Sequence, residues 1–474
     1  DPKPPVAEEA AQEVADGAAP APESVPAATP ADAPAATGAV AGALQERGIG
    51  KGEIDPVDLA RTYLDAIAAH PMRDRIYARV TADRAMAEAR AASARAKSGH
   101  RLSPLDGVPI SWKDLFDTAG IATEAGTAYL KGRTPEQDAE VLRLATGKGL
   151  VCLGKTHMTE IAFSGLGYNP ITATPPNKVD PEAVPGGSSS GAAASVAFGL
   201  AAAGIGSDTG GSVRVPSGWN DLVGLKTTHG RLSLEGVVPL CKTFDTVGPL
   251  CRTVEDAALF WDILGGDAVG LDGADLSRVR LAVLDTIGTE DLEDEPRAAF
   301  RSAVARLNDA GAESSHITFE PLREAFAMAG GLFTADAYAY WRETIEARPD
   351  LMYHQILKRI RPGGEVLAAD YIANWARLEE IRAEYAAATA GFDAVILPTM
   401  PIMAPNLERL AKDDAYFVSS NLMALRNTRV GNLMGLCSIT LPTGVPGCGI
   451  MFNGQAGQEG RLLRLAAAAE QALA

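Results

Sequence analysis

The sequence predicts an α/β fold with a large mixed, mostly parallel central sheet covered by helices on both faces. Short apolar runs typical of buried strands alternate along the chain with longer helical stretches, a pattern that favours this class. The chain has 474 residues, of which 46% are hydrophobic, so it can bury a large core. No internal repeat and no linker follows residue 50, which favours one large domain behind an N-terminal arm.

Local signals place the individual elements. Asp55 is suited to cap a helix over 56–69, and Pro56 suits its first position. An Ala/Arg-rich stretch with a period near 3.6 predicts a second helix over 81–97. The other predicted helices are 136–148, 192–203, 254–264, 296–309 and 369–390, and the predicted strands are 107–111, 150–153, 280–284 and 393–397.

The N-terminal segment differs in composition from the rest. Residues 1–37 are mostly Ala, Pro and Glu, and they have too few large apolar side chains to offset the cost of ordering. We therefore predict a disordered tail over 1–37, a helical arm over 38–100 and the main domain over 101–474. The sequence shows no basic-then-apolar signal peptide, which favours a cytoplasmic location.

Composition also narrows the function classes. The net charge of −17 argues against a nucleic-acid surface, because neutralising phosphates requires clustered Lys and Arg. The uncharged stretch between Glu182 and Asp208 is rich in Gly, Ala and Ser, so we expect a packed internal segment and no membrane partner. The five cysteines form no C-x-x-C pair and the six histidines no H-E-x-x-H motif, so we expect buried free thiols, no metal and no cofactor.

Two Gly/Ser clusters, at 185–191 and 206–212, are the strongest functional signal in the chain. Each combines hydroxyl groups with residues that turn the backbone sharply, as acyl transfer requires at a nucleophile and its oxyanion hole. Ser212 closes a Thr-Gly-Gly-Ser turn and is the predicted nucleophile. The predicted oxyanion hole consists of the backbone N–H groups of Thr209, Gly210, Gly211 and Ser212.

A serine nucleophile needs a base, and no histidine has a suitable local context. Lys113 follows an apolar, strand-like run that would deliver its ammonium into the interior. Burial lowers the pKa of a lysine from about 10.4, so a neutral amine can act as a base near neutral pH. Ser188 is placed to relay a proton between Lys113 and Ser212. An ion pair of Lys113 with Asp114 or Asp117 is the structural alternative.

Five motifs in a fixed order resemble the amidase signature family. They are V-P-I-S-W-K-D, P-G-G-S-S-S-G, G-S-D-T-G-G-S-V-R-V-P, V-G-L-K-T-T-H-G-R-L-S and F-D-T-V-G-P-L. The likeness runs from about residue 44 to the C-terminus and favours the free-standing amidase branch. It implies an amidase-signature fold with Ser212 as acylated nucleophile, Ser188 as a bridging serine with a cis peptide bond, and Lys113 as general base.

The resemblance also suggests supporting residues. It pairs Asp208 with Arg214 to hold the nucleophile loop, although Arg214 facing a substrate carboxylate is the alternative. Ser189 is expected to hydrogen-bond Lys113. The segment Ala162, Phe163, Ser164 and Gly165 matches a lining of the acyl pocket, with a core role for Phe163 as the alternative.

Taken together, these features predict a hydrolase that converts a small-molecule amide to a carboxylic acid and ammonia or an amine. Two alternatives remain open: the glutaminase (A) subunit of a tRNA-dependent amidotransferase, and a non-catalytic scaffold of the same fold. A homodimer is expected from the family alone. The substrate and the role of Ser190 stay undefined by the sequence.

Overall fold

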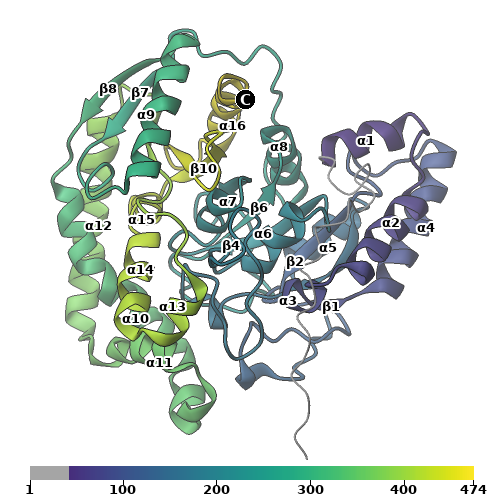
Figure 1. Cartoon of the computed structure of the whole chain (residues 1–474), viewed down its shortest axis with the longest axis horizontal. Helices are drawn as coiled ribbons and strands as arrows, with labels where there is room; N and C mark the ends of the chain where they lie inside the picture. The colour runs from purple at the N-terminus through teal and green to yellow at the C-terminus, as the bar shows by residue number, and fades with distance from the viewer. Residues whose placement is uncertain (1–41) are drawn as a thin grey trace, which may run out of the picture. The chain divides into compact units, whose positions relative to one another are not determined.

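A single mixed sheet organises the residues that the computed structural model describes, 42–474 (Figure 1). The predicted disordered tail, 1–37, lies outside the described residues. In the described part the sheet has eleven strands, in the order β1-β3-β2-β4-β6-β5-β10-β11-β9-β7-β8. They are β1 (Tyr77–Val80), β2 (Pro109–Lys113), β3 (Val151–Thr156), β4 (Ala203–Asp208), β5 (Val223–Lys226), β6 (Thr246–Cys251), β7 (Arg280–Leu284), β8 (Glu313–Ile317), β9 (Ala394–Pro398), β10 (Cys437–Pro442) and β11 (Gly449–Gly454).

The predicted α/β class and the mixed sheet are confirmed, but parallel pairs are not the majority. Among the described strands, β3-β2-β4 and β9-β7-β8 pair in parallel, which makes four pairs, and the other six pairs are antiparallel. The expectation of a mostly parallel sheet assumed a helix between successive strands. Only residues 443–448 separate β10 from β11, and no helix separates β5 from β6, so these neighbours run antiparallel.

The helices match most of the predicted ranges. Asp55 caps α2 as expected, its carboxylate accepting a hydrogen bond from the Val57 N–H at 2.9 Å. The described helices are α1 (Gly42–Gly50), α2 (Pro56–Ala69), α3 (Arg73–Ile76), α4 (Ala82–Ser98), α5 (Glu140–Gly147), α6 (Ser190–Ala197), α7 (Arg214–Trp219), α8 (Val254–Ile263), α9 (Asp294–Asp309), α10 (Pro321–Ala347), α11 (His354–Ile360), α12 (Ala368–Thr389), α13 (Leu407–Lys412), α14 (Asp414–Ala424), α15 (Arg429–Leu433) and α16 (Glu459–Leu473).

The predicted helix over 192–203 is wrong in its bounds. The alanines favour a helix, but α6 ends at Ala197, and Gly199 adopts a left-handed backbone with φ of 74°. The chain then enters β4 at Ala203, a strand that the sequence analysis did not predict. Its Gly- and Ala-rich sequence has one β-branched residue, Ile205, and no aromatic residue, so it does not carry the usual composition of a strand.

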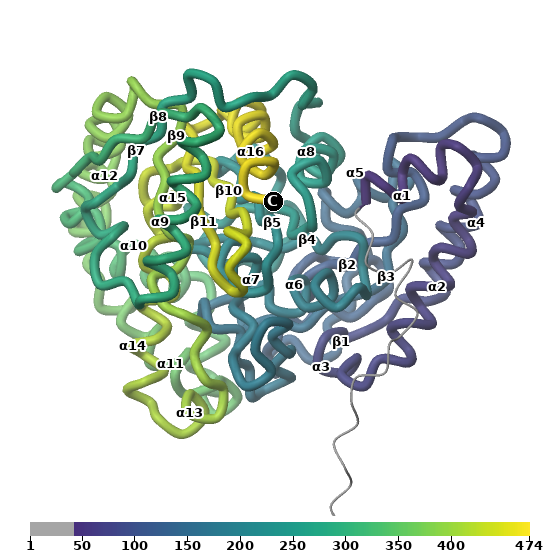
Figure 2. Tube along the Cα trace, turned by 45° about the horizontal axis from the view of Figure 1, so that its top comes forward, coloured from purple at the N-terminus to yellow at the C-terminus, as the bar shows by residue number. Residues whose placement is uncertain are grey.

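Helices cover both faces of the central sheet, as predicted. Every residue of β2, β3, β4, β6, β9 and β11 is buried, which requires cover on both sides, whereas β8 at the edge is largely exposed. In the arm, α2 and α4 lie side by side next to β3 (Figure 2). The boundary that we predict between the arm and the main domain at residue 100 stays a prediction.

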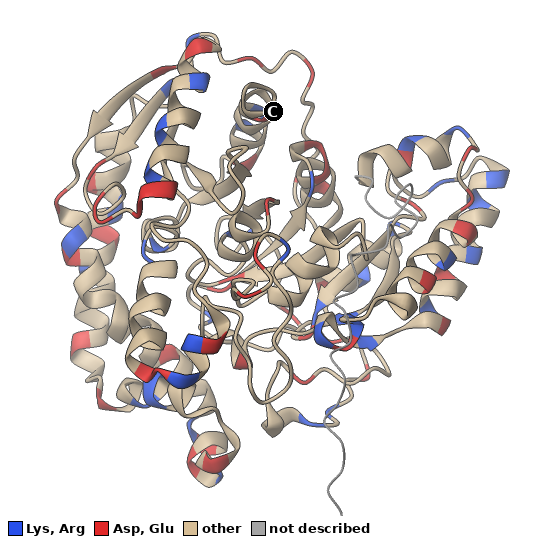
Figure 3. Cartoon of the chain, in the orientation of Figure 1, with Lys and Arg blue, Asp and Glu red and all other residues tan. Residues whose placement is uncertain are grey.

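Charged residues are frequent on the outer helices, such as α4 and α12, and less frequent in the centre (Figure 3). All five cysteines are buried and unpaired, as predicted. Within residues 42–474, no helix is both long enough and apolar enough to cross a membrane.

Candidate active site

Two parallel neighbouring strands deliver the predicted catalytic residues to one edge of the sheet. Strands β2 and β4 pair in parallel, with Ile110 opposite Ala203 and Trp112 opposite Ile205. Lys113 ends β2 and Asp208 ends β4, so both residues leave the sheet at the same edge. The turn that carries Ser212 follows β4 directly.

The Lys113 side chain reaches the first Gly/Ser cluster. Its ammonium nitrogen lies 2.7 Å from Ser188 Oγ and 2.8 Å from Ser207 Oγ, and the whole residue is buried. Burial lowers the pKa of Lys113 from 10.5 to about 7, although attraction by the Asp245 and Asp208 carboxylates raises it. Lys113 is therefore largely available as a neutral amine above pH 7.

The alternative ion pairs of Lys113 are not formed. Asp114 pairs with Arg79 at 3.0 Å and lies 3.4 Å from Lys155, whereas Asp117 pairs with Arg133 at 2.7 Å. Both acids are thus engaged by other cations, and Lys113 remains directed at hydroxyl groups.

The first cluster adopts the backbone expected at Ser188. The peptide bond between Gly187 and Ser188 is cis. A side chain at Gly187 would place its Cβ 2.6 Å from both the Gly167 backbone nitrogen and Thr159 Oγ1, so only glycine fits.

Ser189 differs from its predicted role. Its hydroxyl group bonds the backbone of Ser207, at 3.2 Å to the carbonyl and 3.3 Å to the N–H, and does not contact Lys113. Ser207 instead supplies the second hydroxyl on Lys113. The sequence analysis missed Ser207 because β4 was not predicted, and the side-chain direction of a residue cannot be assigned without its strand.

A buried ion pair holds the turn that carries Ser212. Arg214 donates to both Asp208 oxygens, at 2.9 and 3.0 Å, and neither side chain is exposed. Burial alone would raise the pKa of Asp208, but the charge and hydrogen bonds of Arg214 outweigh it and hold the pKa below its usual value. Arg214 also donates to Asn432 Oδ1 at 2.6 Å and to the Thr428 carbonyl at 2.7 Å. These bonds agree with the first role that we predict for Arg214, which is to pair with Asp208 and hold the loop.

The oxyanion-hole prediction needs one adjustment. The Gly211 N–H donates to Asp208 Oδ1 at 2.9 Å, so this donor is already engaged. Among residues 42–474, no acceptor bonds the N–H groups of Thr209, Gly210 and Ser212. These three N–H groups are therefore free to donate a hydrogen bond to a substrate oxygen. The Asp208 carboxylate holds the backbone beside them at Gly211.

Asp245 supports the same turn from the β6 side. It accepts a hydrogen bond from the Thr209 hydroxyl at 2.5 Å and bonds from the N–H groups of Leu240 and Cys241. Burial raises the pKa of Asp245 to about 6, although these bonds favour its charged form. The motif F-D-T-V-G contains Asp245, but the sequence did not assign it a role.

Ser212 lines a small cavity. The cavity has a volume of about 30 Å³, and its walls include Ala162, Phe163 and Ser164 of the predicted pocket segment. Gly165 is not part of the lining; it packs against Leu425 and donates its N–H to Asn421 Oδ1 at 2.9 Å. The remaining lining residues are Thr209, Gly210, Leu240, Phe333, Arg359, Leu425 and Arg429.

One link of the predicted relay is open. In the described part of the chain no hydrogen bond joins Ser212 Oγ to another group, so Ser188 is hydrogen-bonded to Lys113 but not to Ser212. Phe163 is only 4% exposed within the core and also lines the cavity, and its role in an acyl pocket stays a prediction.

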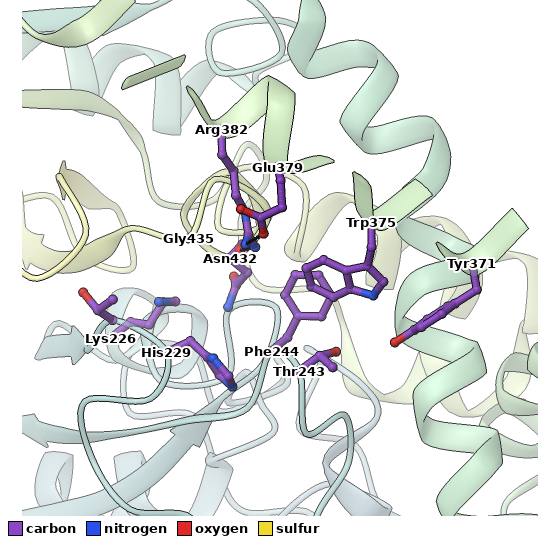
Figure 4. A pocket seen from close by; sticks show the side chains of 11 residues that line it. Lys226, His229, Thr243, Phe244, Tyr371, Trp375, Glu379, Arg382, Asn432 and Gly435 are labelled. Atoms are coloured by element: carbon purple, nitrogen blue, oxygen red, sulfur yellow. Dashed lines mark hydrogen bonds and ion pairs between the residues drawn. The ribbon is translucent and has the colours of Figure 1, made fainter. Parts of the chain in front are cut away.

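The structure also contains a larger cavity of about 540 Å³ (Figure 4). Lys226, Phe244, Trp375 and Arg382 line it, and it shares no lining residue with the cavity at Ser212. A row of aromatic rings separates the two: Phe244 lies 4.3 Å from Phe333 and 5.0 Å from Trp375 between ring centres. Of the predicted catalytic residues, Ser212 lines the smaller cavity, and none lines the larger one.

Comparisons with known proteins identify the family of this chain. The profile of the family described as Amidase matches residues 58–463. The chain belongs to the amidase family. Members of this family are amide hydrolases, and this chain is one of them.

Individual relatives cover most of this amidase. A Comamonas testosteroni protein named 2-amino-5-chloromuconic acid deaminase is 35% identical over 85% of this chain and 90% of its own length. The A subunit of glutamyl-tRNA(Gln) amidotransferase from Acidothermus cellulolyticus is 32% identical over 84% of this chain and 86% of its own. A crystal structure of an amidase superposes with a TM-score of 0.83 at 30% identity, covering 92% of this chain and 100% of the other.

Proposed function

We propose that this amidase hydrolyses small-molecule amides through an acyl-enzyme on Ser212, with Lys113 as base and Ser188 as proton relay. The observation that carries the proposal is the buried Lys113 amine, with a pKa of about 7, held 2.7 Å from Ser188 Oγ. A base with a pKa near the working pH combines a usable neutral fraction with a strong drive to accept a proton.

In the proposed cycle, Ser212 Oγ attacks the amide carbonyl carbon. Its proton passes to Ser188, whose own proton passes to Lys113. The C–N bond then breaks, and the nitrogen leaves as ammonia or an amine after taking up the proton from Lys113 by the reverse route. Water repeats the attack on the ester, and the carboxylic acid and free Ser212 are formed.

The free N–H groups of Thr209, Gly210 and Ser212 support the oxyanion in both tetrahedral intermediates. Each well-placed donor contributes about 2.7–4 kcal/mol to transition-state stabilisation. Asp208 and Asp245 act on this turn through its backbone and through Thr209, so we assign them positioning roles.

Labelling and turnover test the nucleophile together. Ser212→Ala should abolish both amide hydrolysis and covalent labelling by a fluorophosphonate. Ser217→Ala is the matched control: Ser217 is buried on α7, and within residues 42–474 its hydroxyl has no hydrogen-bond partner. Labelling that persists in Ser212→Ala would refute the assignment.

The amidotransferase relatives support a second candidate, the glutaminase subunit of a tRNA-dependent amidotransferase. This function would require partner chains. Ammonia or amine release from simple amides by the purified chain alone favours the free-standing hydrolase, and activity that appears only with partner proteins favours the second candidate. A cytoplasmic location, supported by the five free thiols, and a homodimer remain predictions.

A further inference from the structure

The larger cavity, of about 540 Å³, lies at the same edge of the sheet as the turn that carries Ser212. Strands β4 and β5 both pair antiparallel with β6, so they run in the same direction and end at the same edge. Asp208 ends β4, and Lys226, which lines the cavity, ends β5. A cavity of this size with an aromatic lining and a few polar groups is typical of a small-molecule site.

Two adjacent residues of the lining have unused hydrogen-bond donors. The Lys226 ammonium donates to the carbonyls of Thr227 and Leu436, at 2.7 and 2.6 Å, and within residues 42–474 its third N–H has no acceptor. Thr228 Oγ1 accepts a bond from the Gly457 N–H at 2.8 Å, while its own proton has no acceptor in the same part of the chain. Both donors therefore suit an acceptor that a ligand supplies.

Lys226 is also a buried cation without an ion-pair partner in the described chain. The only carboxylate in the described lining, that of Glu379, pairs with Arg382 at 2.7 Å. Burial lowers the pKa of Lys226 to about 8, although the carboxylates of Asp208 and Glu459 raise it, so Lys226 remains mostly charged at pH 7. A charged donor of this kind favours an anionic acceptor.

Aromatic rings form the other side of the cavity. Phe244, Trp375 and Tyr371 lie together, to one side of Lys226 and His229 (Figure 4). The ring centre of Trp375 lies 5.0 Å from that of Phe244 and 6.5 Å from that of Tyr371. Aromatic side chains favour offset or edge-to-face contact with a further ring. The two sides together suit a flat ring that carries an acidic group.

We propose that this cavity is a second ligand site and that it binds an aromatic carboxylate. The carboxylate accepts hydrogen bonds from Lys226 and Thr228, and the ring packs against Phe244 and Trp375. The site is separate from the cavity at Ser212, since the two share no lining residue. It goes beyond the proposed function, because it requires no chemistry at Ser212.

The cavity also touches a support of the Ser212 turn. Asn432 lines it and donates to Asp208 Oδ1 at 2.9 Å, and the same oxygen accepts the bond from the Gly211 N–H. A ligand in contact with Asn432 can therefore change turnover without occupying the cavity at Ser212.

Calorimetry on the full-length protein at pH 7 tests the binding chemistry. The probes are 2-naphthoate and 2-naphthylmethanol, which have the same rings but differ in charge. We expect naphthoate to bind about 10- to 100-fold more tightly, as expected for hydrogen bonds to a charged group. Equal dissociation constants, or no detectable heat with millimolar naphthoate, would overturn the proposal.

Variants locate the site. Trp375→Leu should weaken naphthoate binding by about 3- to 10-fold through the lost ring contact, and Thr228→Val should reduce the advantage over the alcohol by about tenfold. Lys226→Met should remove that advantage; because Lys226 also holds two carbonyls, the other two variants decide the question where it does not fold.

Phe163→Leu is the matched control, because Phe163 is an aromatic residue of the cavity at Ser212. Affinity that survives in both Trp375→Leu and Thr228→Val would refute the site. Affinity lost in Phe163→Leu and kept in Trp375→Leu would place naphthoate beside Ser212 and also overturn the proposal.

Steady-state kinetics with butyramide separates this site from the substrate's. Naphthoate should change kcat and leave KM within about twofold. Purely competitive inhibition would overturn the proposal, and two unchanged constants would reject the connection through Asn432. Calorimetry needs no turnover, so naphthoate binding that is weakened in Trp375→Leu would support the site even if Ser212 were not the nucleophile. Absence of binding would reject the site and leave the amidase function intact.

Discussion

The pH dependence of hydrolysis provides the sharpest test of Lys113 as base. Lys113 must be neutral to accept a proton, and burial lowers its pKa to about 7. Activity should therefore fall as the pH drops through 7, because the amine becomes protonated. The neutral fraction is about 0.9 at pH 8 and about 0.1 at pH 6, so kcat/KM should be about tenfold lower at pH 6. A neutral amide such as butyramide keeps substrate ionisation out of the profile.

Ser207→Ala perturbs that pKa in a defined direction. Ser207 Oγ accepts a hydrogen bond from Lys113 at 2.8 Å, and a charged donor gains more from such a bond than a neutral one. Removing the acceptor costs the ammonium form about 1 kcal/mol more than the amine, which lowers the pKa by roughly 0.7. The loss of kcat/KM between pH 8 and pH 6 should then shrink from about tenfold to about threefold.

Two neighbouring carboxylates affect how the pH profile of Lys113 is interpreted. Asp245 and Asp208 both raise the pKa of Lys113, and Asp245 itself has a pKa of about 6. Asp245 protonation thus weakens its pull on Lys113 only at the acid end of the range. A flat profile from pH 5 to 9 in the original enzyme, or an acid limb that Ser207→Ala moves to higher pH, would refute the role of Lys113.

Two further predictions concern the turn that carries Ser212. Asp208→Asn leaves Arg214 buried without its counter-charge, so the free energy of unfolding in urea should fall by about 3–5 kcal/mol; an unchanged denaturation midpoint would show that the pair does not hold the turn. Gly211→Ala would place a Cβ 2.1 Å from Thr428 Oγ1 at a φ of 140°, and we expect Ser212 labelling to slow by at least about 100-fold. Gly457→Ala, at a φ of 75° but with open space around it, is the control: unchanged labelling in Gly211→Ala, or an equal loss in both variants, would contradict the local effect.

Helices and strands with clear signals in their own sequence were predicted correctly. The bounds of α2 were predicted without error, because Asp55 and Pro56 define its start in the sequence as they do in the structure. Strand β7 was also predicted over its full range, 280–284, because its apolar run is short and isolated. The sequence likewise predicted the Lys113–Ser188 contact, since the two Gly/Ser clusters and the lysine belong to recognisable motifs.

The missed features depend on contacts between distant parts of the chain. Strand β4 was not predicted, so Ser207 was given no role, and the hydrogen bond to Lys113 was assigned to Ser189. Arg359 and Arg429 lie more than 140 positions beyond Ser212 and belong to no motif. Only the packing of α11 and α15 against the Ser212 turn brings them to the cavity. A pattern of sequence spacing contains no such information.

The choice between lysine and arginine explains how neighbouring parts of one site can hold both a neutral amine and charged guanidinium groups. Burial lowers the pKa of Lys113 to about 7 and that of Arg359 to about 9. The ordinary pKa of an arginine is above 12. Burial that makes a lysine neutral near pH 7 therefore leaves an arginine charged. A lysine at position 359 would therefore lose much of its charge near neutral pH. Lysine at position 113 thus suits a neutral base, whereas arginine at position 359 keeps a positive charge beside the Ser212 cavity.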